Sequence, residues 1–277
     1  MQPYQSRLAL ITGGSSGIGF ALAKQILQNE GNVAILARRK ELLESAVKAL
    51  EKVRVHPDQL ILPIQADVTH QSELASSLTE FVKRNGLPDF VFNSAGVAHP
   101  GNFSALKNDI FHWMMNVNYF GTVNVLKVLV PLMQKRRCGT IVNISSIAGF
   151  IGVYGYTAYS ASKFAVSGFT DALRAELRPY GIQVSIVFPP DTDTPQLEYE
   201  SKYKPNVTKE ISKSAKLMSA DSVAIEIIKQ VANKKYLILP GSEGKFLYFA
   251  RNLLGASLYP VMDMMVKFAI KKIKFGE

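Results

Sequence analysis

Apolar and polar positions follow two alternating patterns along this chain. Short apolar runs rich in β-branched residues are separated by longer segments in which apolar residues recur with the period of a helix. We expect strands at 8–12, 32–37, 60–65, 90–93, 140–145, 183–188 and 236–239. We expect helices at 17–29, 40–53, 71–84, 109–134, 158–178 and 220–233. This alternation predicts an α/β fold, with a doubly wound, parallel, seven-stranded sheet covered by helices on both faces.

Two segments depart from this alternation. Residues 191–216 form a polar, lysine-rich stretch after the sixth strand, where ligands of open α/β sheets dock, so they are either a substrate lid or an ordinary surface insertion. Residues 246–277 mix apolar residues with lysines and contain Pro260, which predicts an amphipathic helical tail too interrupted to span a bilayer. The tail lies on an anionic membrane surface or packs on the protein or a partner subunit. Residues 1–245 form the main domain.

Composition narrows the class of protein. A chain of 277 residues that is 47% hydrophobic can bury one sizeable core. The formal charge of +10 favours an anionic partner, such as a phosphorylated cofactor, an acidic lipid surface or nucleic acid, but also fits a basic surface with no specific partner. Cys138 is the single cysteine, so an intramolecular disulfide and a cysteine-rich zinc site are excluded and a reducing compartment is expected. Residues 1–7 hold no apolar run, so we expect neither a signal peptide nor an N-terminal anchor.

A glycine-rich segment follows the first strand. Residues 12–19, TGGSSGIG, lead directly into a helix, so small side chains let backbone amides approach a pyrophosphate at the helix N-terminus. The context predicts a Rossmann-type dinucleotide site, although a simple tight turn would use the same residues. The candidate cofactor-binding residues in this loop are Gly13, Ser15, Ser16, Gly17 and Ile18.

The ends of the next three strands add cofactor candidates. Ala37 stands where an NAD site usually places a carboxylate, and the guanidinium of Arg38 can bind a 2′-phosphate, which favours NADP over NAD. A solvated arginine at the end of a strand is the alternative. Turn-forming residues follow the third and fourth strands at the same edge of the sheet, where they line the adenosine side or simply form turns. These candidates are Asp67, Val68, Asn93, Ala95 and Gly96.

A tyrosine and a lysine lie one helical turn apart. Tyr159 and Lys163 share a helix face, whereas Tyr154 and Tyr156 have no cation four residues on. A phenol titrates at about 10 in water, and a neighbouring ammonium, with an oxidised nicotinamide, would lower that pKa. Tyr159 is therefore the candidate proton donor, unless both side chains merely extend along an amphipathic helix.

Two further polar residues lie close to this pair in the predicted fold. Ser146 follows the fifth strand at the ligand-binding edge, where its hydroxyl can hydrogen-bond a carbonyl oxygen or cap the next turn. Asn118 lies inside a long helical pattern, where Asn has poor propensity. It either holds a water that links Lys163 to solvent or is a hydrogen-bonded core amide.

Taken together, the glycine loop, residues 93–96 (NSAG), Asn118, Ser146 and the Tyr159/Lys163 pair resemble the motif set of the short-chain dehydrogenase/reductase family over residues 7–240. The resemblance implies that the serine orients a carbonyl, the tyrosine donates a proton, the lysine binds the nicotinamide ribose and the asparagine supports a proton relay. A bound nicotinamide cofactor would supply hydride. Pro189, Thr192 and Thr194 would contact the cofactor, with Thr194 near the nicotinamide carboxamide.

A narrower resemblance concerns residues 188–195 and 159–165, which are similar to those of family members that reduce long-chain 3-keto bases. It implies an NADPH-dependent ketone reductase acting on a long-chain keto lipid, with Gln196 where that group usually has Gly. A ketoacyl or steroid-type carbonyl reductase and a noncatalytic NADP-binding regulator are the alternatives. We expect a homo-oligomer that is cytoplasmic, or peripheral at the cytoplasmic membrane face through its tail. No nucleic-acid motif accompanies the basic charge, so no nucleic-acid partner is expected.

Overall fold

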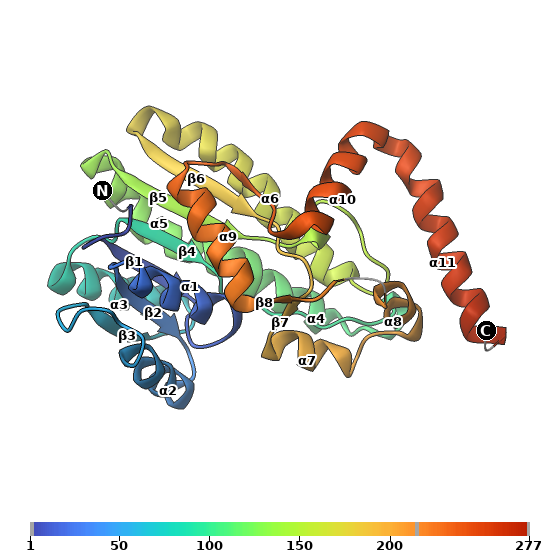
Figure 1. Cartoon of the computed structure of the whole chain (residues 1–277), viewed down its shortest axis with the longest axis horizontal. Helices are drawn as coiled ribbons and strands as arrows, with labels where there is room; N and C mark the ends of the chain where they lie inside the picture. The colour runs from blue at the N-terminus through green and yellow to red at the C-terminus, as the bar shows by residue number, and fades with distance from the viewer. Residues whose placement is uncertain (1–2, 214–215, 276–277) are drawn as a thin grey trace.

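The computed structural model describes residues 3–213 and 216–275, so residues 214–215 of the predicted lid and the last two residues of the tail lie outside it, as do residues 1–2. Within the described residues a parallel sheet has the strand order β3-β2-β1-β4-β5-β6-β9 (Figure 1). Its strands are β1 Leu8–Thr12, β2 Asn32–Ala37, β3 Ile61–Gln65, β4 Phe90–Asn93, β5 Gly139–Ile144, β6 Ile182–Val187 and β9 Leu237–Ile238. The predicted doubly wound, seven-stranded α/β fold is confirmed.

Helices cover both faces of the sheet, and each face has its own apolar core. One core joins the sheet to α1, α2 and α9, and the other joins it to α3, α5 and α6. These helices are α1 Gly17–Gln28, α2 Lys40–Glu51, α3 Gln71–Asn85, α5 Gly121–Arg136, α6 Thr157–Leu177 and α9 Ala220–Ala232. Because the strands are covered on both sides, they read as continuous apolar runs.

The helix predicted at 109–134 is not one regular helix. It consists of α4 Asn108–Met114, a π-helical turn at Met115–Phe120 and α5. A π turn inserts one extra residue and rotates the side chains that follow it. Asn118 lies inside this turn, and its amide is almost fully buried. Helical periodicity does not reveal such a turn, because it shows only where apolar residues recur along the chain.

The predicted lid contains regular structure. Strand β7 Thr192–Asp193 pairs in parallel with β8 Met218–Ser219, and it is followed by α7 Pro195–Ser201 and α8 Asn206–Ser212. Thr194 caps α7 by accepting a hydrogen bond from the amide of Leu197 at 3.3 Å. These short elements place the segment beyond the carboxyl end of β6, beside the sheet edge that carries the glycine loop (Figure 1).

The tail forms two helices, of which the first packs through Leu247 and Tyr248 on an apolar cluster that includes Phe188, and the second extends away from the sheet (Figure 1). Helix α10 Gly241–Leu254 and helix α11 Leu258–Phe275 meet at a bend where Gly255 has a φ of 53°. From the sequence alone, Pro260 is expected to interrupt the tail. It lies in the first turn of α11, where a missing amide proton costs nothing, so the helix continues past it. By length and composition, the segment Gly241–Lys274 of the described chain is long and apolar enough to cross a membrane. The expectation that the tail is too interrupted to span is therefore wrong by that criterion.

Helix α11 rests on the lid at only a few points. Lys272 forms an ion pair of 2.8 Å with Glu210 of α8, and Ala269 is buried. Most other side chains of α11 are exposed. The tail therefore packs on its own subunit along a narrow strip, and much of its apolar surface faces outward.

Candidate active site

A cavity of about 790 Å³ opens at the carboxyl edge of the sheet. It brings together most of the residues that the sequence singles out, from segments as far apart as the glycine loop and the lid. Those that line it are Gly13, Ser15, Ser16, Gly17, Ile18, Arg38, Asp67, Val68, Ala95, Gly96, Ser146, Tyr159, Lys163, Pro189, Thr192 and Thr194. The two remaining candidates, Asn93 and Asn118, are buried behind its wall.

The glycine loop leaves no room for a side chain at its first glycine. Gly13 has a φ of +68°, and a Cβ there would lie 2.9 Å from the Cα of Ala95. The hydroxyl of Thr12 accepts hydrogen bonds from the amides of Ser94 and Ala95, which ties the end of β1 to the end of β4. The side chain of Ser16, the N-cap residue of α1, makes no capping bond, so the amides of the first helical turn are available to an anion. This cradle fits the pyrophosphate of a dinucleotide.

A cation and an anion face each other at the adenosine end. The Arg38 guanidinium lies 3.6 Å from a carboxylate oxygen of Asp67, and more than half of the Arg38 side chain is exposed. Burial alone would raise the pKa of Asp67, but hydrogen bonds from Thr69 and the charge of Arg38 hold that pKa below its usual value. Asp67 is therefore a fixed acceptor, and Arg38 retains donors for a phosphate group.

Tyr159 and Lys163 both lie on the buried face of α6. The Lys163 Nζ lies 5.7 Å from the centre of the Tyr159 ring and donates a hydrogen bond of 3.0 Å to the carbonyl oxygen of Ile144. Burial lowers the pKa of the Lys163 ammonium to about 8. Burial, with the charge of Glu200, raises the pKa of Tyr159, and hydrogen bonds from Ser146 and Gln196 oppose that rise. Burial is therefore the largest influence on this phenol, and the lowering of its pKa by Lys163 together with an oxidised nicotinamide stays a prediction.

Ser146 lies beside the phenol at the end of β5. Its hydroxyl accepts a hydrogen bond of 3.2 Å from the amide of Ala148, and it also hydrogen-bonds the Tyr159 hydroxyl. The serine therefore caps the next turn, as one alternative had it, and at the same time faces the reactive phenol. A carbonyl oxygen that bound here could reach both hydroxyl groups.

The two asparagines hold the wall of the cavity in place. The amide of Asn118 accepts a hydrogen bond from the Val97 amide and donates to the Val97 carbonyl and to the Ser162 hydroxyl. Asn93 donates to Asn143, whose amide donates to Thr170. The interpretation of Asn118 as a hydrogen-bonded core amide is confirmed, whereas its role in a water relay stays a prediction.

The residues after β6 close the other side of the cavity. The carbonyl of Pro189 accepts a hydrogen bond of 3.2 Å from the amide of Ile147, and the Thr192 hydroxyl donates one of 2.8 Å to Pro190. A Cβ on Gly17 would lie 3.2 Å from the methyl group of Thr194, so the lid touches the cofactor cradle. The cofactor roles of these residues stay predictions.

Several residues that line the cavity are not among the candidates that the sequence indicates. Tyr156 and Glu200 line the cavity, as do Leu247 of α10 and Met265 of α11. Gln196 stands out in the sequence only because the resembling group usually has glycine at this position. Nothing in the sequence pattern points to Glu200, because Tyr156, its partner on another helix, lies 44 residues away in the chain.

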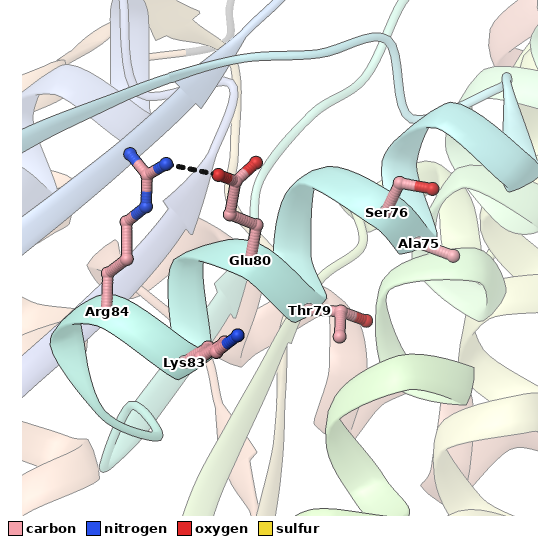
Figure 2. Close-up of a pocket in the computed structure, with 6 residues that line it drawn as sticks. All are labelled: Ala75, Ser76, Thr79, Glu80, Lys83 and Arg84. Atoms are coloured by element: carbon pink, nitrogen blue, oxygen red, sulfur yellow. Dashed lines mark hydrogen bonds and ion pairs between the residues drawn. The ribbon is translucent and has the colours of Figure 1, made fainter.

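A second hollow lies on the outer surface of α3, far from this edge (Figure 2). An ion pair between Arg84 and Glu80 lies at one end of it, and Ser76 and Thr79 provide the other polar groups. The residues that line it come from one exposed helix, and none of them is a sequence-based candidate. The chemistry of the chain is therefore concentrated in the large cavity.

Comparison with known proteins agrees with this geometry. The sequence model of short chain dehydrogenases matches residues 7–204. The 3-ketodihydrosphingosine reductase of Bos taurus is 34% identical over 257 residues, which cover 92% of this chain and 76% of the relative. The 3-dehydrosphinganine reductase of Danio rerio is 37% identical over 239 residues, which cover 86% and 72%.

Solved structures show the same architecture. A crystal structure of levodione reductase aligns with a TM-score of 0.78 at 25% identity and covers 87% of this chain and 98% of that one. The structure of ElxO with NADP bound aligns with a TM-score of 0.73 at 29% identity and covers 85% and 97%. The chain therefore belongs to the short-chain dehydrogenase family and is an oxidoreductase with a Rossmann-type fold.

Proposed function

We propose that this protein reduces the ketone of a long-chain base with NADPH, converting 3-ketodihydrosphingosine to dihydrosphingosine in sphingolipid synthesis. The observation that carries the proposal is the meeting of the Ser146 and Tyr159 hydroxyls in one cavity with the Lys163 ammonium and a dinucleotide cradle. Relatives named for this reaction, which match most of the chain, support the choice of substrate.

In this mechanism NADPH held in the glycine-loop cradle would supply hydride for the carbonyl carbon. Ser146 donates a hydrogen bond to the carbonyl oxygen and orients it. Tyr159 gives its phenolic proton to that oxygen as negative charge develops there, so the product is an alcohol and the phenol becomes a phenolate. Lys163 stabilises the phenolate and would hydrogen-bond the nicotinamide ribose, and Asn118 holds the adjoining wall through Val97.

The preference for NADP over NAD rests on Arg38. No carboxylate occupies position 37, and the exposed Arg38 guanidinium is available to a 2′-phosphate. Asp67 pairs with one nitrogen of the Arg38 guanidinium, so other N–H donors of that group stay available. Gly13, Ser15, Ser16, Gly17 and Ile18 would hold the pyrophosphate, and Asp67, Val68, Asn93, Ala95 and Gly96 would shape the adenosine side. Pro189, Thr192 and Thr194 would lie at the nicotinamide end.

The tail would bring the enzyme to its lipid substrate. We propose that α10 and α11 lie on an anionic membrane surface, with apolar side chains in the lipid and the lysines of α11 at the headgroups. Leu247 and Met265 line the cavity, so an alkyl chain that leaves it passes directly along the tail. The large apolar residues exposed on the tail are Phe246, Phe249, Leu253, Leu254, Tyr259, Val261, Met264, Met265, Phe268 and Ile273.

A substrate panel tests the proposal. Purified protein with NADPH should oxidise the cofactor faster with 3-ketodihydrosphingosine than with ketoacyl or steroid ketones. Tyr159→Phe should lower turnover by at least about a hundredfold, the size of a general-acid contribution, while NADPH still binds. Faster turnover of a ketoacyl thioester would favour the second candidate, and wild-type turnover by the Tyr159→Phe variant would contradict the mechanism. Cofactor binding without turnover of any ketone would favour a noncatalytic NADP-binding protein.

A further inference from the structure

A buried carboxylate from the lid lies next to the reacting groups. Glu200, on α7, is only 7% exposed and lines the cavity. One carboxylate oxygen accepts a hydrogen bond of 2.6 Å from the Tyr156 hydroxyl, and the other accepts one of 3.0 Å from the Gln196 amide. Both donors are neutral, so the charge of Glu200 is held in place without being neutralised by them.

Glu200 is close to the proton donor through these same partners. Gln196 also hydrogen-bonds the Tyr159 hydroxyl, so one amide lies between the phenol and the carboxylate. The rings of Tyr156 and Tyr159 lie 5.7 Å apart between their centres. A group attached to the carbon next to a ketone held at Tyr159 would therefore lie within reach of Glu200.

The charges around this end of the cavity do not balance. Asp191 and Glu200 are both acidic, and the Lys204 ammonium, 3.5 Å from Asp191, is their cation on the lid. The charge of Lys163 also acts on Glu200, but the Lys163 ammonium hydrogen-bonds the Ile144 carbonyl, and Arg38 and Arg39 line the adenosine end. Among the described residues that line the cavity, those near the lid therefore carry more negative than positive charge, whereas those near the cofactor cradle carry more positive charge. Burial raises the pKa of Glu200 by more than the hydrogen bonds from Tyr156 and Gln196 and the charge of Lys204 lower it.

We propose that Glu200 binds a protonated amine on the carbon next to the substrate ketone, and so selects long-chain amino ketones over plain ketones. The inference rests on the proposed function and extends it to the group that the lid recognises. A buried carboxylate is costly unless it is paired, and an ammonium ion in the cavity would supply that pair. A neutral ketone requires no such charge, so a site built only for ketoacyl or steroid substrates would gain nothing from it.

The competing explanation is that Glu200 only fastens α7 to the start of α6 through Tyr156. The two roles are separated by a ratio of rates. The protein is assayed with a long-chain 2-amino-3-ketone and with the matching 3-ketone that lacks the amine. Glu200→Gln keeps the shape and can still hydrogen-bond Tyr156. Glu198→Gln changes an exposed carboxylate on the same helix and is the matched control.

Glu200→Gln should lower the ratio of kcat/KM for the amino ketone over the plain ketone by about tenfold or more, the effect of losing a hydrogen bond to a charged group. Glu198→Gln should keep the wild-type ratio. Changes in folding, and any change in the acidity of Tyr159 that does not depend on the amine, affect both substrates and cancel in the ratio. An unchanged ratio in Glu200→Gln, whatever the absolute rates, would overturn the inference.

A binding measurement separates this inference from the proposed reaction. Calorimetry with NADP-saturated protein compares a long-chain primary amine with the alcohol of the same chain length. Wild-type protein should bind the amine about tenfold or more tightly, and Glu200→Gln should lose that difference. Equal affinities in the wild-type protein would overturn the amine site even if ketones are reduced. A preference for the amine in a protein that reduces no ketone would keep the site and reject the proposed function.

Discussion

The buried ammonium of Lys163 should make the folded protein less stable than a variant with an uncharged side chain of similar size at this position. Burial lowers the pKa of this group from an ordinary value of 10.5 to about 8. One pKa unit corresponds to about 1.4 kcal/mol, so keeping the ammonium charged at neutral pH costs about 3 kcal/mol of folding free energy. A methionine at this position would leave the Ile144 carbonyl without the hydrogen bond that Lys163 donates to it, which takes back about 1–2 kcal/mol. Lys163→Met, which fills a similar volume without charge, should therefore be more stable than wild type at pH 7 by about 1–2 kcal/mol.

The pH dependence gives the sharper test. Between pH 8 and 10.5 the folded protein releases the Lys163 proton whereas the unfolded chain retains it, so the wild type gains stability as pH rises through this window. The stability of the wild type relative to Lys163→Met should rise by about 2 kcal/mol from pH 7 to 9.5. Taking the difference between the two proteins removes the contributions of groups that they share.

Urea unfolding of the cofactor-free proteins, followed by circular dichroism at pH 7, 8.5 and 9.5, measures this difference. Lys52→Met, which removes an exposed lysine at the end of α2, is the control for changing a lysine elsewhere. Lys163→Met should also lose reductase activity, because the residue that costs stability is the one proposed to support the phenolate. A difference between wild type and Lys163→Met that stays constant from pH 7 to 9.5 would refute the reasoning.

Three further predictions concern other parts of the molecule. Arg38→Ala should weaken NADPH binding by about ten- to a hundredfold in a fluorescence titration and leave NADH binding nearly unchanged, and equal losses for both cofactors would contradict a 2′-phosphate contact. Gly13→Ala should abolish cofactor binding and lower the melting temperature, because the new methyl group would lie 2.9 Å from the Ala95 backbone in a left-handed conformation, and a variant that binds NADPH normally would exclude this. Phe268→Asp should reduce flotation with anionic vesicles, whereas Thr79→Asp, which adds the same charge on α3, should not, and equal flotation of both variants would count against membrane contact through α11.

The sequence predicts those parts of the fold and site that depend on local pattern. Strands buried on both faces are apolar along their whole length, so β1, β2 and β4 have the predicted ends. The glycine loop and the Tyr159/Lys163 pair are recognisable because their members are close in the chain and their spacing matches a turn or one helix face. The cavity lining includes Tyr159, Lys163 and the loop candidates Gly13, Ser15, Ser16, Gly17 and Ile18.

Features that depend on distant contacts could not be predicted in this way. The π turn is centred on Asn118, whose amide bonds Val97 and Ser162, and neither partner is apparent from helical periodicity. The rise in the Tyr159 pKa comes mainly from burial, and the four-residue spacing between Tyr159 and Lys163 does not reveal burial. Pro260 resembles a helix breaker in the sequence, but it is harmless because the helix begins only two residues before it.

The division between local and distant contacts also separates chemistry from specificity in this protein. Most residues that would hold the cofactor or move the proton lie on α1 and α6 or just after strands β1 to β5, and these elements are fixed by the two buried cores. The groups that would recognise a substrate lie on α7, α8, α10 and α11, and the tail helices have few buried side chains. Substitutions in these later elements can therefore alter the amine site or the alkyl path without disturbing the sheet. Since Glu200 also raises the pKa of Tyr159, an ammonium bound at Glu200 would partly cancel that charge and ease formation of the phenolate. Recognition of the amine and delivery of the proton would then be coupled through one carboxylate.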